Sequence, residues 1–130
     1  MPNIYLQQLH GRKTGALFCA SLLLGAIAAG KEPARDAALF DALRAYAHGV
    51  GLAFQVLDDI LDVTADPALL GKTKGKDEAE EKNSFLKYYT LTEAQSLADE
   101  LTDGAITAIA GIPGSERLVA LAKYLQNRSY

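Results

Sequence analysis

A long stretch in the first half of this sequence is apolar around almost the whole circumference of a helix, and this limits the folds open to the chain. It begins after Pro33 and runs to about Val63, and Asp66-Pro67 marks its end because a residue before proline avoids the helical conformation. A surface helix carries a narrow apolar stripe, whereas the narrow stripe here is polar. We therefore expect a buried helix whose polar stripe faces an internal cavity or paired groups.

Three further helices complete the predicted fold. The first runs from about Ile4 to Ala29, and Gly30 suits its C-terminal end. Another opens at Thr92, where Thr92-x-x-Gln95 has the spacing of a capping box, and runs to about Ala110. Gly111-Ile112-Pro113-Gly114 separates it from the last, which runs from Ser115 to about Asn127. Ala and Leu, which favour helix, outnumber the β-branched residues, so the prediction is an all-α antiparallel helical bundle.

The third and fourth predicted helices each have an apolar side that should face the core. The residues expected there are Leu97, Leu101, Ile106 and Ile109 on the third helix, and Leu118, Leu121, Ala122 and Leu125 on the fourth. The segment between Asp66 and Tyr89 lacks helical periodicity and is too long for a simple bundle connection. Loops of that length usually carry function.

Composition excludes several classes of protein. The 130 residues carry a formal net charge of −3, which makes nucleic acid an improbable partner because a basic surplus would be needed. The lone Cys19 excludes an internal disulfide and fits a reducing compartment. The apolar run from Ala16 to Gly30 is shorter than the ~20 residues that a bilayer requires, so it predicts a buried helix. No targeting or transmembrane segment is evident, and we expect a cytoplasmic protein.

Three aspartates stand out on the second predicted helix. At ~100° per residue, its polar residues fall within about one quadrant, with Arg44 a turn or two before the rest: His48, Gly51, Gln55, Asp58, Asp59 and Asp62. Acids near a helix C-terminus are disfavoured by the macrodipole and by one another. Mg2+, held by one or two carboxylates with water and substrate phosphates, would offset this cost. The prediction is a Mg2+ site for a phosphorylated ligand; the alternative is a solvated acidic helix end.

Two groups of basic residues could meet such a ligand. Gly71-Lys72-Thr73-Lys74-Gly75-Lys76-Asp77 is not a P-loop by spacing, but flexible backbone with point charges suits a phosphate that arrives with metal. Lys13 and Thr14 could both donate hydrogen bonds to a diphosphate oxygen. The alternatives are a solvated loop and an ordinary exposed helix start.

The remaining reactive side chains are expected to be structural. His10 and His48 have no second His or Cys at ligand spacing, so we interpret them as hydrogen-bonded structural residues. Cys19 lies in an apolar run and is interpreted as a small core residue.

The ordered motifs of the chain resemble those of a known enzyme family. Lys13-Thr14-Gly15, Gly51-Leu52-Ala53-Phe54-Gln55-x-x-Asp58-Asp59-Ile60-Leu61-Asp62 and Gly71-Lys72-x-x-Gly75-x-Asp77 resemble the C-terminal half of the trans-isoprenyl diphosphate synthases, with the bacterial farnesyl diphosphate synthases (geranyltranstransferases) most similar. The resemblance runs from about Leu6 to Arg128. It implies that residues 1–130 form a single partial domain, the C-terminal part of the isoprenoid synthase fold.

The resemblance also implies a reaction and a set of site residues. In this family Mg2+ ions bridge an allylic diphosphate, such as dimethylallyl or geranyl diphosphate, to two aspartate-rich motifs. Ionisation gives an allylic carbocation that isopentenyl diphosphate attacks. The residues that match are Asp58, Asp59 and Asp62 for metal, Asp58 foremost; Lys13, Thr14 and Lys72 for the allylic diphosphate; Gln55 beside the cavity; Phe54 near the homoallylic substrate; and Lys82 for substrate binding. Related enzymes are commonly homodimers, which implies the same here.

The chain departs from the family pattern in two places. The other aspartate-rich motif is absent, because Asp77-Glu78-x-Glu80-Glu81 has the wrong spacing. Lys82-Asn83-Ser84-Phe85-Leu86 stands where the family has Lys-x-Thr-Tyr-Pro. We therefore expect this chain alone to be inactive. The alternative is a non-catalytic Mg-diphosphate-binding or regulatory subunit; a terpene cyclase is disfavoured because the Lys-Thr-Gly and Gly-Lys elements belong to chain elongation.

Overall fold

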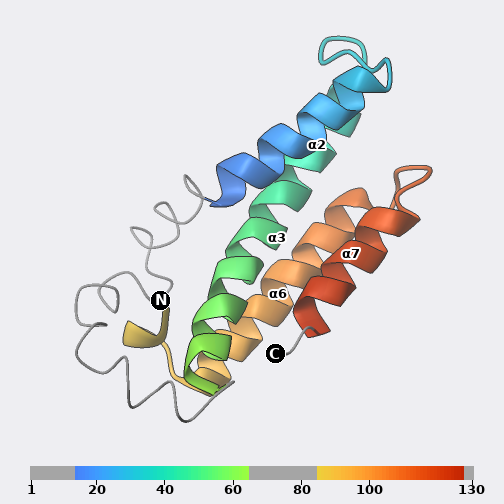
Figure 1. Cartoon of the computed structure of the whole chain (residues 1–130). Helices are drawn as coiled ribbons and strands as arrows, with labels where there is room; N and C mark the ends of the chain where they lie inside the picture. Colours follow the sequence, from blue (N-terminus) through green and yellow to red (C-terminus); the bar gives the residue numbers. More distant parts are fainter. Residues whose placement is uncertain (1–13, 65–84, 128–130) are drawn as a thin grey trace.

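A computed structural model describes residues 14–64 and 85–127 of the chain (Figure 1). The described elements are α2 (Ala16–Ala28), α3 (Ala37–Thr64), the 3-10 helix η2 (Phe85–Lys87), α6 (Leu91–Ile109) and α7 (Glu116–Asn127). Within these ranges the structure contains helices and no strand, which confirms the all-α prediction. Figure 1 shows consecutive helices running antiparallel, with α2 beside α3 and α6 beside α7.

Helix α3 is the centre of the described bundle, since it contacts α2, η2, α6 and α7. Its largest buried side chains are Phe40 and Tyr46, each 1% exposed. Gly49 allows α6 to approach closely, because a β-carbon there would lie 2.8 Å from the carbonyl oxygen of Leu101. The expectation that the second helix is largely buried is confirmed for its middle, where residues 49–53 are all buried.

The close contact between α3 and α6 changes which residues of α6 are buried. The fully buried residues are mostly small: Ala94, Ala98, Thr102, Ala105 and Ile109. The leucines expected there, Leu97 and Leu101, are only partly buried at the edge of the core, as is Ile106. On α7, Ala122 is buried as expected, but Leu121 is 40% exposed. Small side chains occupy the contact because larger ones would force the two backbones apart.

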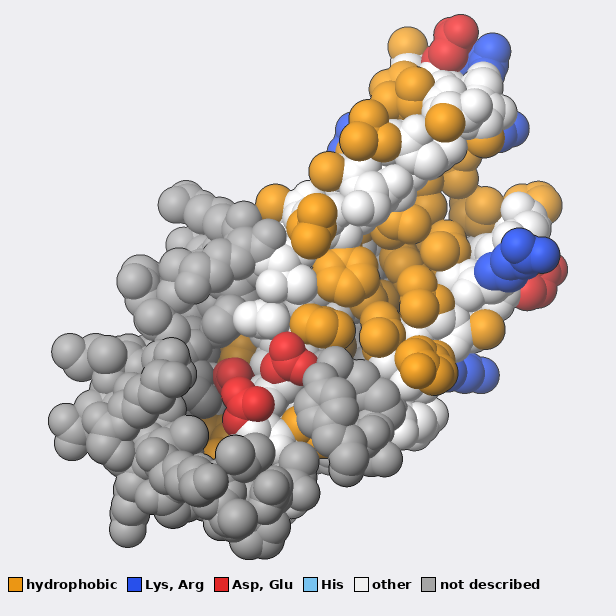
Figure 2. All heavy atoms as spheres, in the orientation of Figure 1, with side chains coloured by type: hydrophobic (Ala, Val, Ile, Leu, Met, Phe, Trp, Pro, Cys, Tyr) orange, Lys and Arg blue, Asp and Glu red, His pale blue; other side chains and the backbone are white. Residues whose placement is uncertain are grey.

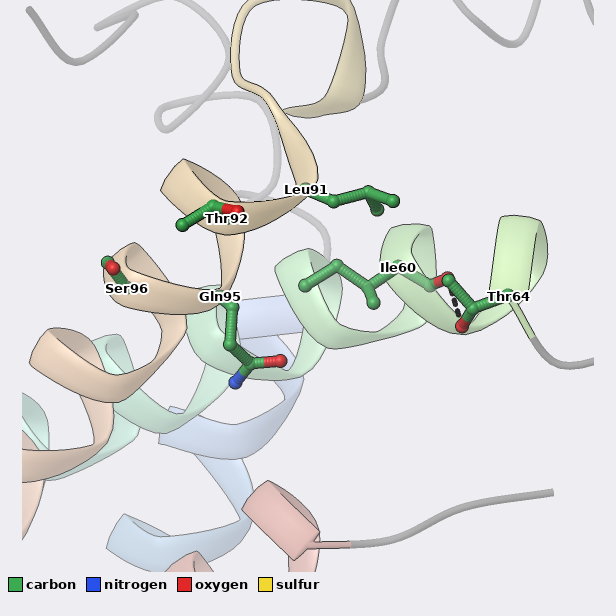
Figure 3. Close-up of a pocket in the computed structure, with 6 residues that line it drawn as sticks. All are labelled: Ile60, Thr64, Leu91, Thr92, Gln95 and Ser96. Atoms are coloured by element: carbon green, nitrogen blue, oxygen red, sulfur yellow. Dashed lines mark hydrogen bonds between the residues drawn. The ribbon is translucent and has the colours of Figure 1, made fainter.

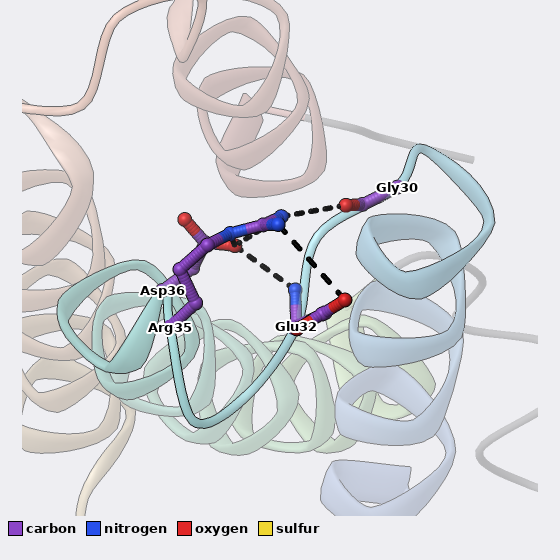
Figure 4. Close-up of polar contacts among 4 residues, drawn as sticks. All are labelled: Gly30, Glu32, Arg35 and Asp36. Carbon is purple, nitrogen blue, oxygen red and sulfur yellow. Dashed lines mark hydrogen bonds and ion pairs between the residues drawn. The ribbon is translucent and has the colours of Figure 1, made fainter.

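The turn from α2 to α3 is held by backbone and side-chain hydrogen bonds. Gly30 has φ +90°, and the Lys31 N–H donates to the carbonyl of Ala26 at 3.0 Å, which confirms Gly30 as the C-terminal glycine of the first helix. The Arg35 guanidinium donates to the carbonyl of Gly30 at 2.8 Å and pairs with Asp36 (Figure 4). The Glu32 N–H donates to the Asp36 carboxylate, which lowers the pKa of Asp36. These bonds fix the turn.

Helix α6 begins at Leu91 with Thr90 as its cap, two residues before the predicted cap at Thr92. The Thr90 hydroxyl accepts from the Glu93 N–H at 3.1 Å, and the Glu93 carboxylate accepts from the Thr90 N–H at 3.0 Å. The prediction of a capping box at Thr92 and Gln95 is therefore wrong. Glu93 brings a negative charge to the first turn, which the helix dipole favours, whereas Gln95 does not. The structure also adds η2 within the segment expected to lack helix.

Helix α2 differs most from its prediction, because none of its residues is fully buried. Leu17, Leu24 and Ile27 are 69%, 65% and 50% exposed. A helix that is apolar all round needs neighbours on every side, and in the described part of the chain its main neighbour is α3. Cys19 is accordingly half-buried and not a core residue. None of the described helices combines the length and apolar character needed to cross a membrane.

Candidate functional site

Three of the four acidic residues of α3, Asp58, Asp59 and Asp62, lie in its last two turns. Gln55 and Asp58 are half-buried, and Asp62 is exposed. Because Gln55, Asp58 and Asp62 follow one another at three and four residues along a helix, they share one side of it. Figure 2 shows acidic side chains gathered at this end of the bundle, with hydrophobic side chains beyond them. The predicted polar stripe is thus a short acidic end next to an apolar surface.

Asp59 faces another element of the fold. Its Oδ2 atom accepts a hydrogen bond from the backbone N–H of Phe85 at 2.8 Å. Phe85 is the first residue of η2 and is fully buried. Sequence reasoning missed this contact because the two residues are 26 positions apart and no local spacing relates them.

A close contact between two glycines places the start of α2 on the same side of α3. Thr14 and Gly15 form a π-helical turn that leads into α2. A β-carbon on Gly51 would lie 2.9 Å from the Cα atom of Gly15. Gly51 and Asp58 are two turns apart on one side of α3, about 10 Å along its axis. Thr14 precedes Gly15 and so lies on the side of α3 that carries Asp58, about two turns away along the axis; its binding of diphosphate stays a prediction.

Phe54 packs against α2. Its ring centroid lies 5.8 Å from that of Phe18, with the ring planes inclined by 58°. Phe54 is half-buried, so one part of its ring packs in the fold and another part faces outward. This position, next to Gln55 in the sequence, is compatible with the predicted role beside an apolar substrate.

Two residues assigned to the polar stripe take no part in the acidic end. Arg44 is exposed and pairs with Asp41 one turn earlier at 3.1 Å. His48 is exposed, and among the described residues its side chain makes no hydrogen bond. The described residues therefore do not support its interpretation as a hydrogen-bonded structural residue. Four of the residues named above lie outside the described residues: His10, Lys13, Lys72 and Lys82.

The donor set at the end of α3 fits Mg2+ only together with other ligands. Across residues 14–64 and 85–127, no three His, Cys, Asp or Glu side chains are arranged to hold a metal ion. Asp58 and Asp62 offer carboxylate oxygens from adjacent turns. Mg2+ is usually held by one or two carboxylates, with water and phosphate oxygens filling its remaining positions. The described residues therefore suit a magnesium ion that comes with a diphosphate.

An open groove at the same end of the bundle lies on the opposite side of α3 from Asp58. Figure 3 shows its lining, which is Ile60, Thr64, Leu91, Thr92, Gln95 and Ser96. The Thr64 hydroxyl donates to the carbonyl of Ile60 at 2.8 Å, and the Gln95 amide donates to Asp99 at 3.2 Å. These two polar groups already have partners within the protein, and we do not assign the groove to the site.

Comparison with known proteins identifies the family of the chain. The polyprenyl synthetase family model matches residues 3–109. A probable farnesyl diphosphate synthase of Bradyrhizobium diazoefficiens is 48% identical over 114 residues, which cover 87% of this chain and 34% of the relative. The farnesyl diphosphate synthase of Escherichia coli is 38% identical over 133 residues, which cover 99% of this chain and 44% of the relative.

A plant protein is similar at the same level. The chloroplastic geranylgeranyl pyrophosphate synthase 7 of Arabidopsis thaliana is 38% identical over 125 residues, covering 95% of this chain and 35% of the relative. The chain thus spans between about a third and a little under half of the length of these relatives. Because one family model matches residues 3–109, most of its length, the chain belongs to the polyprenyl synthetase family.

Proposed function

We propose that the chain is the C-terminal part of a Mg2+-dependent prenyltransferase that condenses isopentenyl diphosphate with an allylic diphosphate, dimethylallyl or geranyl, in isoprenoid biosynthesis. The observation that carries this proposal is the side of α3 shared by Gln55, Asp58 and Asp62, with Thr14 held to it through the contact of Gly15 and Gly51. In a member of this family, that arrangement suits a magnesium diphosphate.

Each residue has a proposed role. Asp58 and Asp62 would hold Mg2+, which when bound neutralises the charge that develops on the departing diphosphate. Thr14 donates its hydroxyl hydrogen to a diphosphate oxygen, and by resemblance Lys13 and Lys72 add positive charge there, with Lys82 as a further substrate contact. Phe54 and Gln55 are half-buried and lie about one turn before Asp58 on α3. They would orient the hydrocarbon part of a substrate and exclude water.

The first aspartate-rich motif of the family has no match in these 130 residues, whereas Asp58, Asp59 and Asp62 match the second. We therefore propose that the chain alone binds magnesium diphosphate without turnover, and that the full-length protein works as a cytoplasmic homodimer. The alternative is a non-catalytic binding or regulatory subunit. In that case the full-length protein would bind magnesium diphosphate but would not condense the two substrates.

The test is a condensation assay with the full-length gene product. Wild type should convert isopentenyl and geranyl diphosphate in the presence of Mg2+ and stop when the ion is chelated. Asp58→Asn should lower kcat by about a hundredfold or more, because it removes charge stabilisation of the leaving group. Asp103→Asn is the matched control, since Asp103 is exposed on α6. It should leave kcat unchanged.

Three outcomes are decisive. A full-length protein without condensation activity would overturn the enzymatic proposal. If calorimetry still showed Mg2+-dependent binding of a bisphosphonate, the regulatory subunit would stand instead. Equal loss of activity in Asp58→Asn and Asp103→Asn would remove Asp58 from the site.

A further inference from the structure

Asp59 is separated from its neighbour Asp58 by about a quarter turn of α3. That rotation points its carboxylate at η2, where Oδ2 accepts from the Phe85 N–H at 2.8 Å. A hydrogen bond from a backbone N–H to an ionised carboxylate is roughly twice as strong as one between neutral groups. The bond joins two elements that are 26 residues apart in the sequence.

Phe85 is well suited to be such an anchor. Its side chain is completely buried and packs in one cluster with Leu52, Val56 and Ala94. The centroid of its ring lies 6.3 Å from the ring centroid of Tyr89, and Tyr89 directly precedes Thr90, the cap of α6. The backbone N–H of a buried residue needs an acceptor, because an unsatisfied one costs the desolvation of the group. Asp59 supplies that acceptor and thereby joins α3, η2 and the beginning of α6.

The end of α3 needs support of this kind. Asp58, Asp59 and Asp62 crowd negative charge into its last two turns, where the helix dipole also disfavours anions. A helix end under such repulsion tends to fray. The Asp59 bond gives one of the three charges a fixed donor on a packed element.

We propose that Asp59 is a positioning residue of the diphosphate site: by binding the Phe85 N–H it fixes η2 against α3 and holds the turn that carries Asp58 and Asp62. This inference rests on the proposed function. It separates the roles of adjacent aspartates, because Asp58 acts on the metal through its charge and Asp59 acts on the backbone through an acceptor oxygen.

The test compares two substitutions of Asp59 with one of Asp58 in the full-length protein. Asp59→Asn keeps an acceptor oxygen of the same shape, whereas Asp59→Ala removes it. The first readout is the hydrogen-exchange rate of the Phe85 amide measured by NMR, which does not depend on turnover. The second is the Mg2+ concentration that gives half-maximal condensation, and the third is the affinity for a bisphosphonate with Mg2+ by calorimetry.

We expect Asp59→Asn to stay closer to wild type than Asp59→Ala in all three readouts, because its amide oxygen still accepts the bond from the Phe85 N–H although it carries no charge. Asp59→Ala should speed exchange of the Phe85 amide about tenfold or more, since a hydrogen bond to a charged group is lost. It should also raise the half-maximal Mg2+ concentration and weaken bisphosphonate binding. Asp58→Asn should lower kcat by about a hundredfold or more, while the Phe85 amide stays as protected as in wild type.

The opposite results would overturn the proposal. If Asp59→Ala left the exchange rate of the Phe85 amide unchanged, the Asp59 carboxylate would not be what holds η2 against α3. If Asp59→Asn lost turnover as fully as Asp58→Asn with the Phe85 amide still protected, Asp59 would act through its charge at the metal. Should wild type fail to condense the substrates, the proposed function falls on its own, while exchange and calorimetry still decide the role of Asp59.

Discussion

Gly51 of α3 lies so close to Gly15, at the start of α2, that a β-carbon on Gly51 would be 2.9 Å from the Cα atom of Gly15. A β-carbon essentially never comes within 3.0 Å of a non-bonded heavy atom. The atom that the β-carbon would meet belongs to the backbone and not to the end of a flexible side chain, so the two helices would have to separate. Thr14 would move with α2.

Gly51→Ala should therefore destabilise the chain although alanine favours helix by about 1 kcal/mol over glycine. The strain of overpacking costs roughly 1–3 kcal/mol and should outweigh that gain. Gly104→Ala is the matched control, because Gly104 lies within α6 and nothing is within 4 Å of a β-carbon there. It should stabilise by about 0.5–1 kcal/mol. Urea unfolding of both variants measures the difference, and a gain in stability for Gly51→Ala would contradict the contact.

Thr90→Ala should destabilise the first turn of α6. The substitution removes the hydroxyl that accepts from the Glu93 N–H and should cost about 0.5–2 kcal/mol of stability. Thr92→Ala tests the position that sequence spacing favoured, and it should change the free energy of unfolding by only a few tenths of a kcal/mol. Thermal unfolding of the two variants distinguishes the caps; a larger loss for Thr92→Ala would place the start of the helix two residues later.

The features of the fold that can be predicted from the sequence are those set by residues close together along the chain. Gly30 could be predicted because its effect on the end of α2 is local. The start of α6 was harder, because Thr90-x-x-Glu93 and Thr92-x-x-Gln95 share a spacing and differ only in the charge of the partner. The exposure of Leu24 could not be read from α2 itself, because burial depends on neighbours.

The residues of the candidate site also fall into those that local sequence spacing predicts and those that it does not. The placement of Gln55, Asp58 and Asp62 on one side of α3 follows from helical periodicity alone. The contact of Asp59 with Phe85 does not, since it depends on how the chain returns to α3 after 26 residues. Periodicity groups residues by helix face, and only the packed structure shows which neighbour each face meets.

Tyr46 should make stability depend on pH at alkaline values. Its hydroxyl donates to the carbonyl of Leu118 at 2.6 Å, and burial raises the pKa of Tyr46 to about 12. In the unfolded chain tyrosine ionises near pH 10. Between about pH 10 and about pH 12 the unfolded state has therefore lost a proton that the folded state keeps. Stability is full below pH 10 and falls as the pH rises through this window.

Tyr46→Phe should remove that part of the pH dependence. At neutral pH the variant should lose about 0.5–1.5 kcal/mol, the typical net contribution of one hydrogen bond. From pH 10 upward its stability should fall less steeply than that of wild type. Tyr124→Phe serves as the control, because Tyr124 is 71% exposed, and its slope should match wild type. Equal slopes for wild type and Tyr46→Phe, from urea unfolding at several pH values, would show that Tyr46 ionises alike in both states.

The apolar face of α2 should make the isolated 130-residue chain associate or aggregate. Leu17, Leu24 and Ile27 leave half or more of their surfaces in water and recur at helical spacing, and large exposed apolar patches promote association. Leu24→Glu places a charge in the middle of this face and should shift the mass measured by light scattering towards that of the monomer. Thr107→Glu adds the same charge at an exposed polar position of α6 and should leave association unchanged. A wild-type chain that stays monomeric at high concentration would contradict the prediction, because its exposed leucines would then need no partner.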